Sequence, residues 1–147
     1  QELLRELTGK RASSGVRKNL PRTNEIKSAK LNAIIAQLTE FEQQKKYLDS
    51  HITISGLATS FKTNTKYLSK VIHQEKGKKF VDYINDLKTT YLIESLKGDL
   101  IDLSATTKDL ILIAGFSSPD ILRRYFKNHT GMTPTAFIKK LKRMKQK

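Results

Sequence analysis

The chain has 147 residues, a length that suits one domain or two very small ones. Lys and Arg number 28 against 14 Asp and Glu, and the net charge of +14 indicates a polyanionic partner, nucleic acid first and an anionic membrane surface second. The absence of cysteine excludes disulfides, thiolate zinc sites and cysteine nucleophiles, and it fits the cytoplasm, the compartment we expect.

Residues 1–23 are rich in Gly, Ser and basic side chains. Such a composition buries little apolar surface, so we expect a flexible basic linker or arm. Because the chain begins with Gln1 rather than Met, we expect either a fragment or a processed form of a longer protein, with the missing part upstream.

An amphipathic helix, either continuous or broken near Thr39, is predicted from Asn24 to about Leu48. Its apolar side chains recur at three- and four-residue steps, at Leu31, Ile34, Ile35, Leu38 and Phe41. The stripe is compatible with three roles: packing on the next unit, self-association through residues 24–48, and transmission of a signal from upstream residues.

Residues 40–79 are predicted to form a first helix-turn-helix unit. Thr53 is a candidate cap for the short helix ISGLATSF, and Asn64 is a candidate cap for the helix that follows. Gly77 supplies a left-handed stop. We therefore expect two short helices joined by a tight polar turn.

Residues 80–97 are predicted to form one connecting helix that acts as a rigid strut. Its apolar stripe is wide enough to contact neighbours on both sides. The stripe consists of Phe80, Tyr83, Ile84, Leu87, Tyr91 and Leu92.

The helix-turn-helix pattern then recurs over residues 104–142, from Thr106 to a helix that ends at Gly131. Leu57 and Leu110 are 53 residues apart, whereas Leu68 and Leu122 are 54 apart, so the second turn contains one extra residue. No segment shows sustained alternation of apolar and polar residues, so strands are not expected. The predicted fold is all-α, with two helix-turn-helix subdomains joined by a long linker helix and preceded by an amphipathic helix.

The second helix of each unit is the candidate DNA-reading element, because a helix-turn-helix inserts that helix into the major groove. Its outer face must then be polar and basic. The candidate DNA-binding residues are Asn64, Thr65, Lys66, Ser69, Lys70 and His73 in the first unit, and Ser118, Pro119, Asp120, Arg123, Arg124 and Lys127 in the second.

The stretch LIAGFSSPDILRRYFKNHTGMTPTAFIKK resembles the second helix-turn-helix of the AraC/XylS family of transcription regulators. The matching positions are Gly115, Phe116, Phe126, Lys127, Gly131, Thr133 and Pro134. The first unit and connecting helix are also similar to that family, so the resemblance covers roughly residues 40–140. Members usually have a small residue where Ile111 stands, aromatic residues at positions 121 and 122, and arginine where Lys88 and Ile138 stand.

The resemblance implies a bacterial-type, sequence-specific regulator that binds double-stranded DNA and reads adjacent major grooves about 34 Å apart. Arg123 or Arg124 would pair with guanine. Asp120 would either accept from cytosine or serve as a favourable charge at a helix N-terminus. RNA polymerase is a further expected partner. An upstream helical-repeat sensor region, in some such regulators attached through a membrane helix, is expected outside this chain.

Two other binding classes also fit the charge. The segment FIKKLKRMKQK is basic and amphipathic, as in a membrane-surface helix, although packing of Phe137, Ile138 and Leu141 on the second unit explains it more economically. An RNA-binding module would require exposed aromatic platforms that the pattern lacks. The basic residues from Lys139 onward fit both a solvated tail and a phosphate-binding surface.

We expect no enzyme activity, metal or cofactor. The three histidines, His51, His73 and His129, have no partners at metal-ligand or triad spacing. The seven glycines are dispersed and form no phosphate-binding loop.

Overall fold

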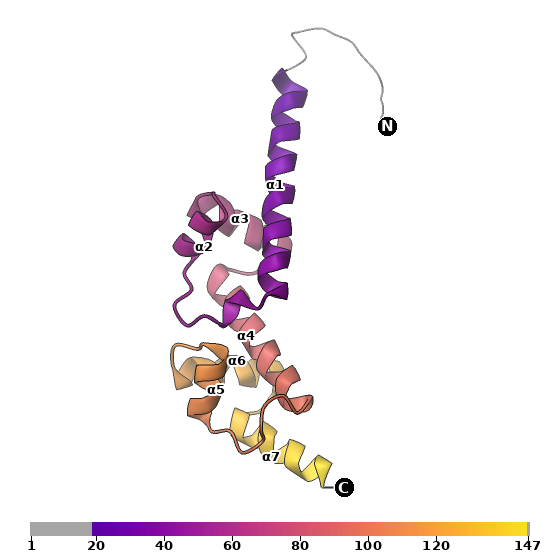
Figure 1. Ribbon diagram of the computed structural model, residues 1–147, viewed down its shortest axis with the longest axis vertical. Helices are drawn as coiled ribbons and strands as arrows, with labels where there is room; N and C mark the ends of the chain where they lie inside the picture. Colours follow the sequence, from indigo (N-terminus) through magenta and orange to yellow (C-terminus); the bar gives the residue numbers. More distant parts are fainter. Residues whose placement is uncertain (1–18, 147) are drawn as a thin grey trace. The chain divides into compact units, whose positions relative to one another are not determined.

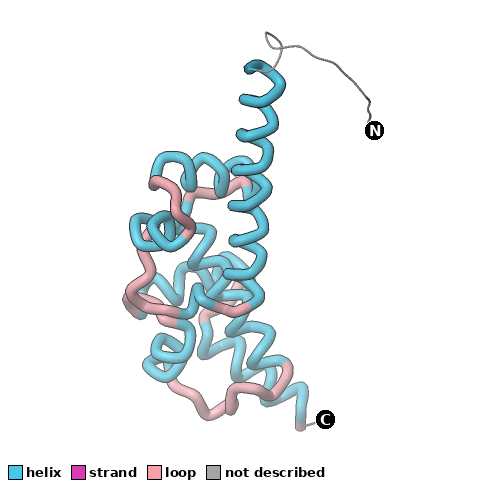
Figure 2. Tube along the Cα trace, turned by 45° about the horizontal axis from the view of Figure 1, so that its top comes forward, coloured by secondary structure: helices cyan, strands magenta, loops and turns pink. Residues whose placement is uncertain are grey.

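The computed structural model describes residues 19–146, with side chains from residue 26 onward. The described residues divide after Ala36 into two compact parts. Throughout the described range the regular elements are helices, with no strand, which confirms the predicted all-α class (Figure 1, Figure 2). The elements are α1 (Asn19–Gln43), the 3₁₀ helix η2 (Lys46–Leu48), α2 (Ile54–Ser60), α3 (Thr65–Lys76), α4 (Phe80–Lys97), α5 (Thr107–Ala114), α6 (Pro119–Thr130) and α7 (Pro134–Lys145).

Helix α1 differs from the prediction at both ends. It begins at Asn19 rather than Asn24. Pro21 is compatible with this start because the N–H groups of a first helical turn have no partners within the helix. The helix ends at Gln43, before Lys45 adopts a left-handed conformation with φ 57° and η2 follows. Five residues of the expected arm are therefore helical, and residues 1–18 lie outside the described part.

Helices α2 and α3 form the first helix-turn-helix with the predicted caps. The hydroxyl of Thr53 accepts a hydrogen bond from the Gly56 N–H at 3.0 Å, and Asn64 Oδ1 accepts from the Tyr67 N–H at 2.8 Å. Gly77 ends α3 with φ 70°. Beneath the two helices lie buried apolar side chains, Leu57, Ala58, Leu68, Val71 and Ile72.

Helices α5 and α6 repeat this arrangement. The left-handed turn residues Lys62 and Gly115 are 53 residues apart, whereas the caps Asn64 and Ser118 are 54 apart. The extra residue therefore lies between the left-handed position and the cap, which confirms the predicted insertion in the second turn. Capping side chains and terminal glycines recur because the helices of both units have backbone groups at their ends that need hydrogen-bond partners.

Helix α4 is the element against which both helix-turn-helices pack: α3 contacts it from the first unit, and α5 and α6 contact it from the second. The hydrophobic core of the second helix-turn-helix extends to α7. There the rings of Phe126 and Phe137 meet edge to face, with their centres 5.3 Å apart. The buried members of this core are Leu92, Leu96, Ile101, Leu110, Ala114, Phe116, Leu122, Phe126, Phe137, Ile138 and Leu141. The apolar side of α7 is thus largely used in packing.

Candidate nucleic-acid interface

The outer face of α3 carries the candidate residues of the first unit. Leu68, Val71 and Ile72 point into the core, at most 1 % exposed. At about 100° of rotation per residue, Lys70 lies nearly opposite Leu68. All six candidates are exposed, namely Asn64, Thr65, Lys66, Ser69, Lys70 and His73.

Helix α6 has the same division. Leu122, Tyr125 and Phe126 are buried, and Arg124 lies nearly opposite Leu122. The other candidates Pro119, Asp120, Arg123 and Lys127 are also exposed, whereas Ser118 is half-buried at the helix start.

The two outer faces correspond position by position at a separation of 54 residues. Lys70 corresponds to Arg124, and His73 corresponds to Lys127. Lys66, however, corresponds to Asp120, so the charge at the first exposed turn is reversed between the units. The two faces therefore share one geometry but differ in charge and side chain.

Two of the candidate DNA-binding residues are helix caps. Asn64 accepts from the Tyr67 N–H at 2.8 Å, and the Ser118 hydroxyl accepts from the Ile121 N–H at 3.2 Å. These bonds satisfy N–H groups that have no partner within the helix. The structure therefore gives both residues a local folding role, whatever they contact in a complex.

Replacing either cap with alanine should lower the free energy of unfolding by about 1 kcal/mol, because one helical N–H loses its acceptor. Asn64→Asp and Ser118→Asp should retain stability, since aspartate caps equally well. If the caps lie near phosphates, the aspartate variants should weaken DNA binding. Urea denaturation and duplex titration measure the two effects separately, and an aspartate variant as unstable as its alanine counterpart would contradict the capping role.

The two arginines of α6 have different local partners. Arg123 pairs with Asp120 across one helical turn at 2.6 Å, with exposed side-chain fractions of 48 % and 90 %. At that exposure the pair adds little stability, but it orients the guanidinium. The Arg124 guanidinium lies 5.4 Å from the centre of the Tyr125 ring.

Helix α6 is held against α4 by side-chain hydrogen bonds that the sequence did not lead us to predict. The Tyr125 hydroxyl donates to Asp82 at 2.5 Å, and His129 Nε2 lies 2.9 Å from Asp86. Asp86 also pairs with Lys78 at 2.8 Å. Burial by itself would raise the pKa of Asp86, but the hydrogen bonds from Lys78 and His129 outweigh it and lower the pKa below its usual value. Asp82 and Asp86 lie four residues apart on α4, so they share one face of the helix. This spacing was the signal in the sequence that could have indicated a polar contact surface.

The segment α7 does not present a continuous apolar surface. Phe137, Ile138 and Leu141 are at most 8 % exposed, and Met144 is the exposed apolar side chain at 60 %. Within the described range, moreover, no helix combines the length and apolar character needed to cross a membrane. Among the side chains of residues 26–146, no group of three His, Cys, Asp or Glu residues is placed to hold a metal ion.

Comparisons with known proteins agree with this geometry. Residues 57–140 match the family described as a helix-turn-helix domain. Three solved structures share the fold. The C-terminal domain of AraT, a response regulator from Geobacillus stearothermophilus, has 19 % identity and a TM-score of 0.59, covering 73 % of this chain and 84 % of that chain.

The C-terminal domain of the two-component response regulator yesN from Fusobacterium nucleatum has 23 % identity and a TM-score of 0.55, covering 69 % and 98 % of the two chains. A DNA-binding transcriptional dual regulator from Escherichia coli K-12 has 13 % identity and a TM-score of 0.55, covering 78 % and 93 %. No curated protein sequence matches the chain. Because the family match spans more than half of its length, the chain belongs to the AraC-type helix-turn-helix family of DNA-binding transcription regulators.

Proposed function

We propose that the chain reads double-stranded DNA by inserting α3 and α6 into successive major grooves, while α2 and α5 cross the phosphate backbone. The observation that supports this is the pair of exposed polar faces at equivalent positions on two helices that both pack against α4. A single chain then recognises two half-sites about one helical turn apart, with no need for two-fold symmetry in the DNA.

Within each face we assign the central cation to base reading and its neighbours to support. Arg124 has the planar donor pair that matches the O6 and N7 atoms of guanine, and Lys70 is its point-charge counterpart. Arg123 and Lys127 flank Arg124, and we assign them to phosphate contacts, which fix the register without reading sequence. Asp120 then serves chiefly to orient Arg123.

Selection of bound sequences from random duplexes tests this proposal. We expect a selected site of two conserved blocks whose centres lie about 10 base pairs apart. One block, or blocks without fixed spacing, would overturn the bipartite reading. Recovery of unselected sequences would overturn specific recognition altogether.

Binding should weaken steeply with salt, because each neutralised phosphate releases counterions. If about six phosphates are contacted, affinity should fall about a thousandfold between roughly 50 and 200 mM salt. Fluorescence anisotropy with a labelled duplex measures the slope. Lys97→Ala, which removes an exposed charge from the end of α4, should leave that slope unchanged, and a salt-independent complex would refute phosphate binding.

Competition distinguishes DNA reading from the two other binding classes. The selected duplex should displace bulk RNA and vesicles containing anionic lipid at equal phosphate concentration. The packing of Phe137, Ile138 and Leu141 favours the duplex, since an interfacial helix requires that face to be available. Preferential retention on vesicles or on single-stranded RNA would favour the corresponding alternative.

Two structural relatives are C-terminal domains of response regulators. By analogy, we propose that this chain serves as the DNA-binding output domain of a longer regulator, with α1 on the side of the signal-receiving region.

A further inference from the structure

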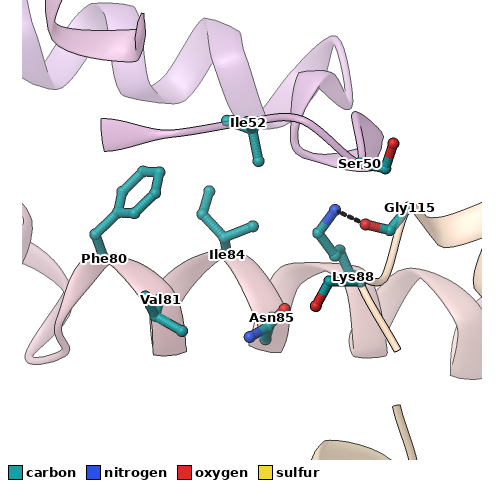
Figure 3. A pocket seen from close by; sticks show the side chains of 9 residues that line it. Ser50, Ile52, Phe80, Val81, Ile84, Asn85, Lys88 and Gly115 are labelled. Atoms are coloured by element: carbon teal, nitrogen blue, oxygen red, sulfur yellow. Dashed lines mark hydrogen bonds between the residues drawn. The ribbon is translucent and has the colours of Figure 1, made fainter. Parts of the chain in front are cut away.

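The joint between the two helix-turn-helix units contains a buried lysine. Lys88 lies in the middle of α4 and is 3 % exposed. Its Nζ donates to the carbonyl of Asp49 at 3.0 Å, ahead of α2, and to the carbonyls of Ala114 and Gly115 at 3.2 and 2.6 Å, at the end of α5. Figure 3 shows the bond to Gly115. An ammonium group has three donors, and here each has a main-chain acceptor.

A close backbone contact occurs at the same place. A Cβ on Gly115 would overlap the carbonyl oxygen of Leu48 and would lie 3.0 Å from Lys88 Nζ. The second turn therefore lies directly against the segment of the first unit that leads into α2. The joint is made from main-chain groups of both units, with Lys88 between them.

A pocket open to solvent lies beside this joint. It has a volume of about 150 Å³ and extends along α4 from Lys88 toward Phe80, and Ile52 and Ile84 point into it (Figure 3). In this region apolar packing does not fill the space between α4 and the segment before α2. The hydrogen bonds of Lys88 consequently matter more for holding the two units in one orientation.

The joint accommodates a cation despite its burial. Carbonyls at the end of α5 carry the negative end of the helix dipole. Burial lowers the pKa of Lys88 to about 8, whereas the charge of Asp49 acts in the opposite direction. The amine is therefore mainly charged at pH 7. A buried charge is tolerated only when its donors are satisfied, as they are here.

We propose that Lys88 is a positioning residue that sets the relative orientation of α3 and α6, and thereby the half-site spacing that the protein accepts. The proposal rests on the two-groove reading above. A residue that only stabilised the fold would affect all DNA alike. A residue that sets orientation should affect the preference for spacing while leaving the binding of one half-site unchanged.

The DNA test uses the selected duplex, the same duplex with one base pair inserted or removed between the half-sites, and a duplex with one half-site scrambled. At pH 7, Lys88→Met should lose about tenfold in affinity for the selected spacing and bind the altered spacings almost as well, because the two units no longer act as one preorganised body. Affinity for the single half-site should not change. Lys88→Arg should restore the preference, since arginine keeps the positive charge and several donors and the adjacent open pocket offers room for its longer side chain.

A second test needs no DNA. The chain has no cysteine, so spin labels can be placed uniquely at Gln74→Cys and Asn128→Cys, two exposed and equivalent positions on α3 and α6. Electron spin distance measurements should give a narrow distribution for the parent, a broader or shifted one for Lys88→Met, and a narrow one for Lys88→Arg. Lys97→Met, on the exposed end of the same helix, is the matched control and should have no effect.

The outcomes separate the two proposals. An unchanged distance distribution in folded Lys88→Met would overturn the role of Lys88. Suppose that Lys88→Met changes the spin-label distance distribution but sequence selection gives no bipartite DNA site. That result would overturn the two-groove reading and leave the positioning role intact. Circular dichroism checks folding, and if Lys88→Met does not fold, Lys88→Gln, which keeps two donors, is measured in both tests by the same criteria.

Discussion

Gly115→Ala should destabilise the protein by about 3 kcal/mol or more. An L-residue in the left-handed region costs about 1–2 kcal/mol, and forcing a methyl group into a packed site adds about 1–3 kcal/mol. At Gly115, with φ 75°, both penalties apply, because the added Cβ would lie 2.8 Å from the carbonyl carbon of Leu48. Urea denaturation of the parent and the variant measures the loss.

Gly131→Ala is the matched control for this prediction. Gly131 has φ 76°, but an added Cβ would meet nothing within 4 Å. Only the conformational penalty applies, so we expect a loss of about 1 kcal/mol. Lys62 occupies the corresponding turn position of the first unit with φ 60°, which shows that a side chain is accommodated where space allows. Equal losses at Gly115 and Gly131 would show that the approach of Leu48 has no energetic consequence.

Arg124→Ala should remove the preference for guanine at one base pair of one half-site and leave the other half-site unaffected. A bidentate contact with guanine contributes about 1–3 kcal/mol of discrimination, which corresponds to about 5- to 150-fold in affinity. Lys70→Ala should act on the opposite half-site with a smaller effect, because its ammonium is a point charge without paired donors. Repeating the sequence selection with each variant locates the altered block.

The conservative variant separates base reading from charge. Arg124→Lys keeps the positive charge but loses the planar pair of donors, so salt dependence should persist while guanine preference declines. Lys97→Ala removes the same charge elsewhere and should leave both half-sites unchanged. If Arg124→Ala and Arg124→Lys instead weaken all duplexes uniformly, Arg124 contacts phosphate and another residue of α6 reads the bases.

Local signals predicted most of the helical elements correctly. Thr53 and Asn64 act as caps, and Gly77 and Gly131 end their helices, because these effects depend on groups a few residues apart. The exposed faces of α3 and α6 also followed from apolar periodicity. The start of α1 was predicted too late, since Pro21 suggests a loop although the first helical turn accepts proline.

The polar contacts of α4 were not predictable in the same way. Asp82 and Tyr125, like Asp86 and His129, are separated by 43 residues, and neither residue type specifies a partner at that distance. The burial of Lys88 was not expected from its residue type, because a charged side chain in the middle of a helix usually lies in solvent. Its burial depends on carbonyls 26 to 39 residues away in the sequence.

Sequence by itself determined the helical class, the duplicated helix-turn-helix and the residues that face outward, because each of these depends on spacing within a single helix or turn. Tertiary structure alone decided how α6 is held against α4 and how the second turn meets the segment before α2. Those contacts require groups from distant parts of the chain to meet in three dimensions. Gly115 illustrates both levels: its left-handed turn is a local property, but the Leu48 carbonyl that excludes any side chain there is brought by the fold.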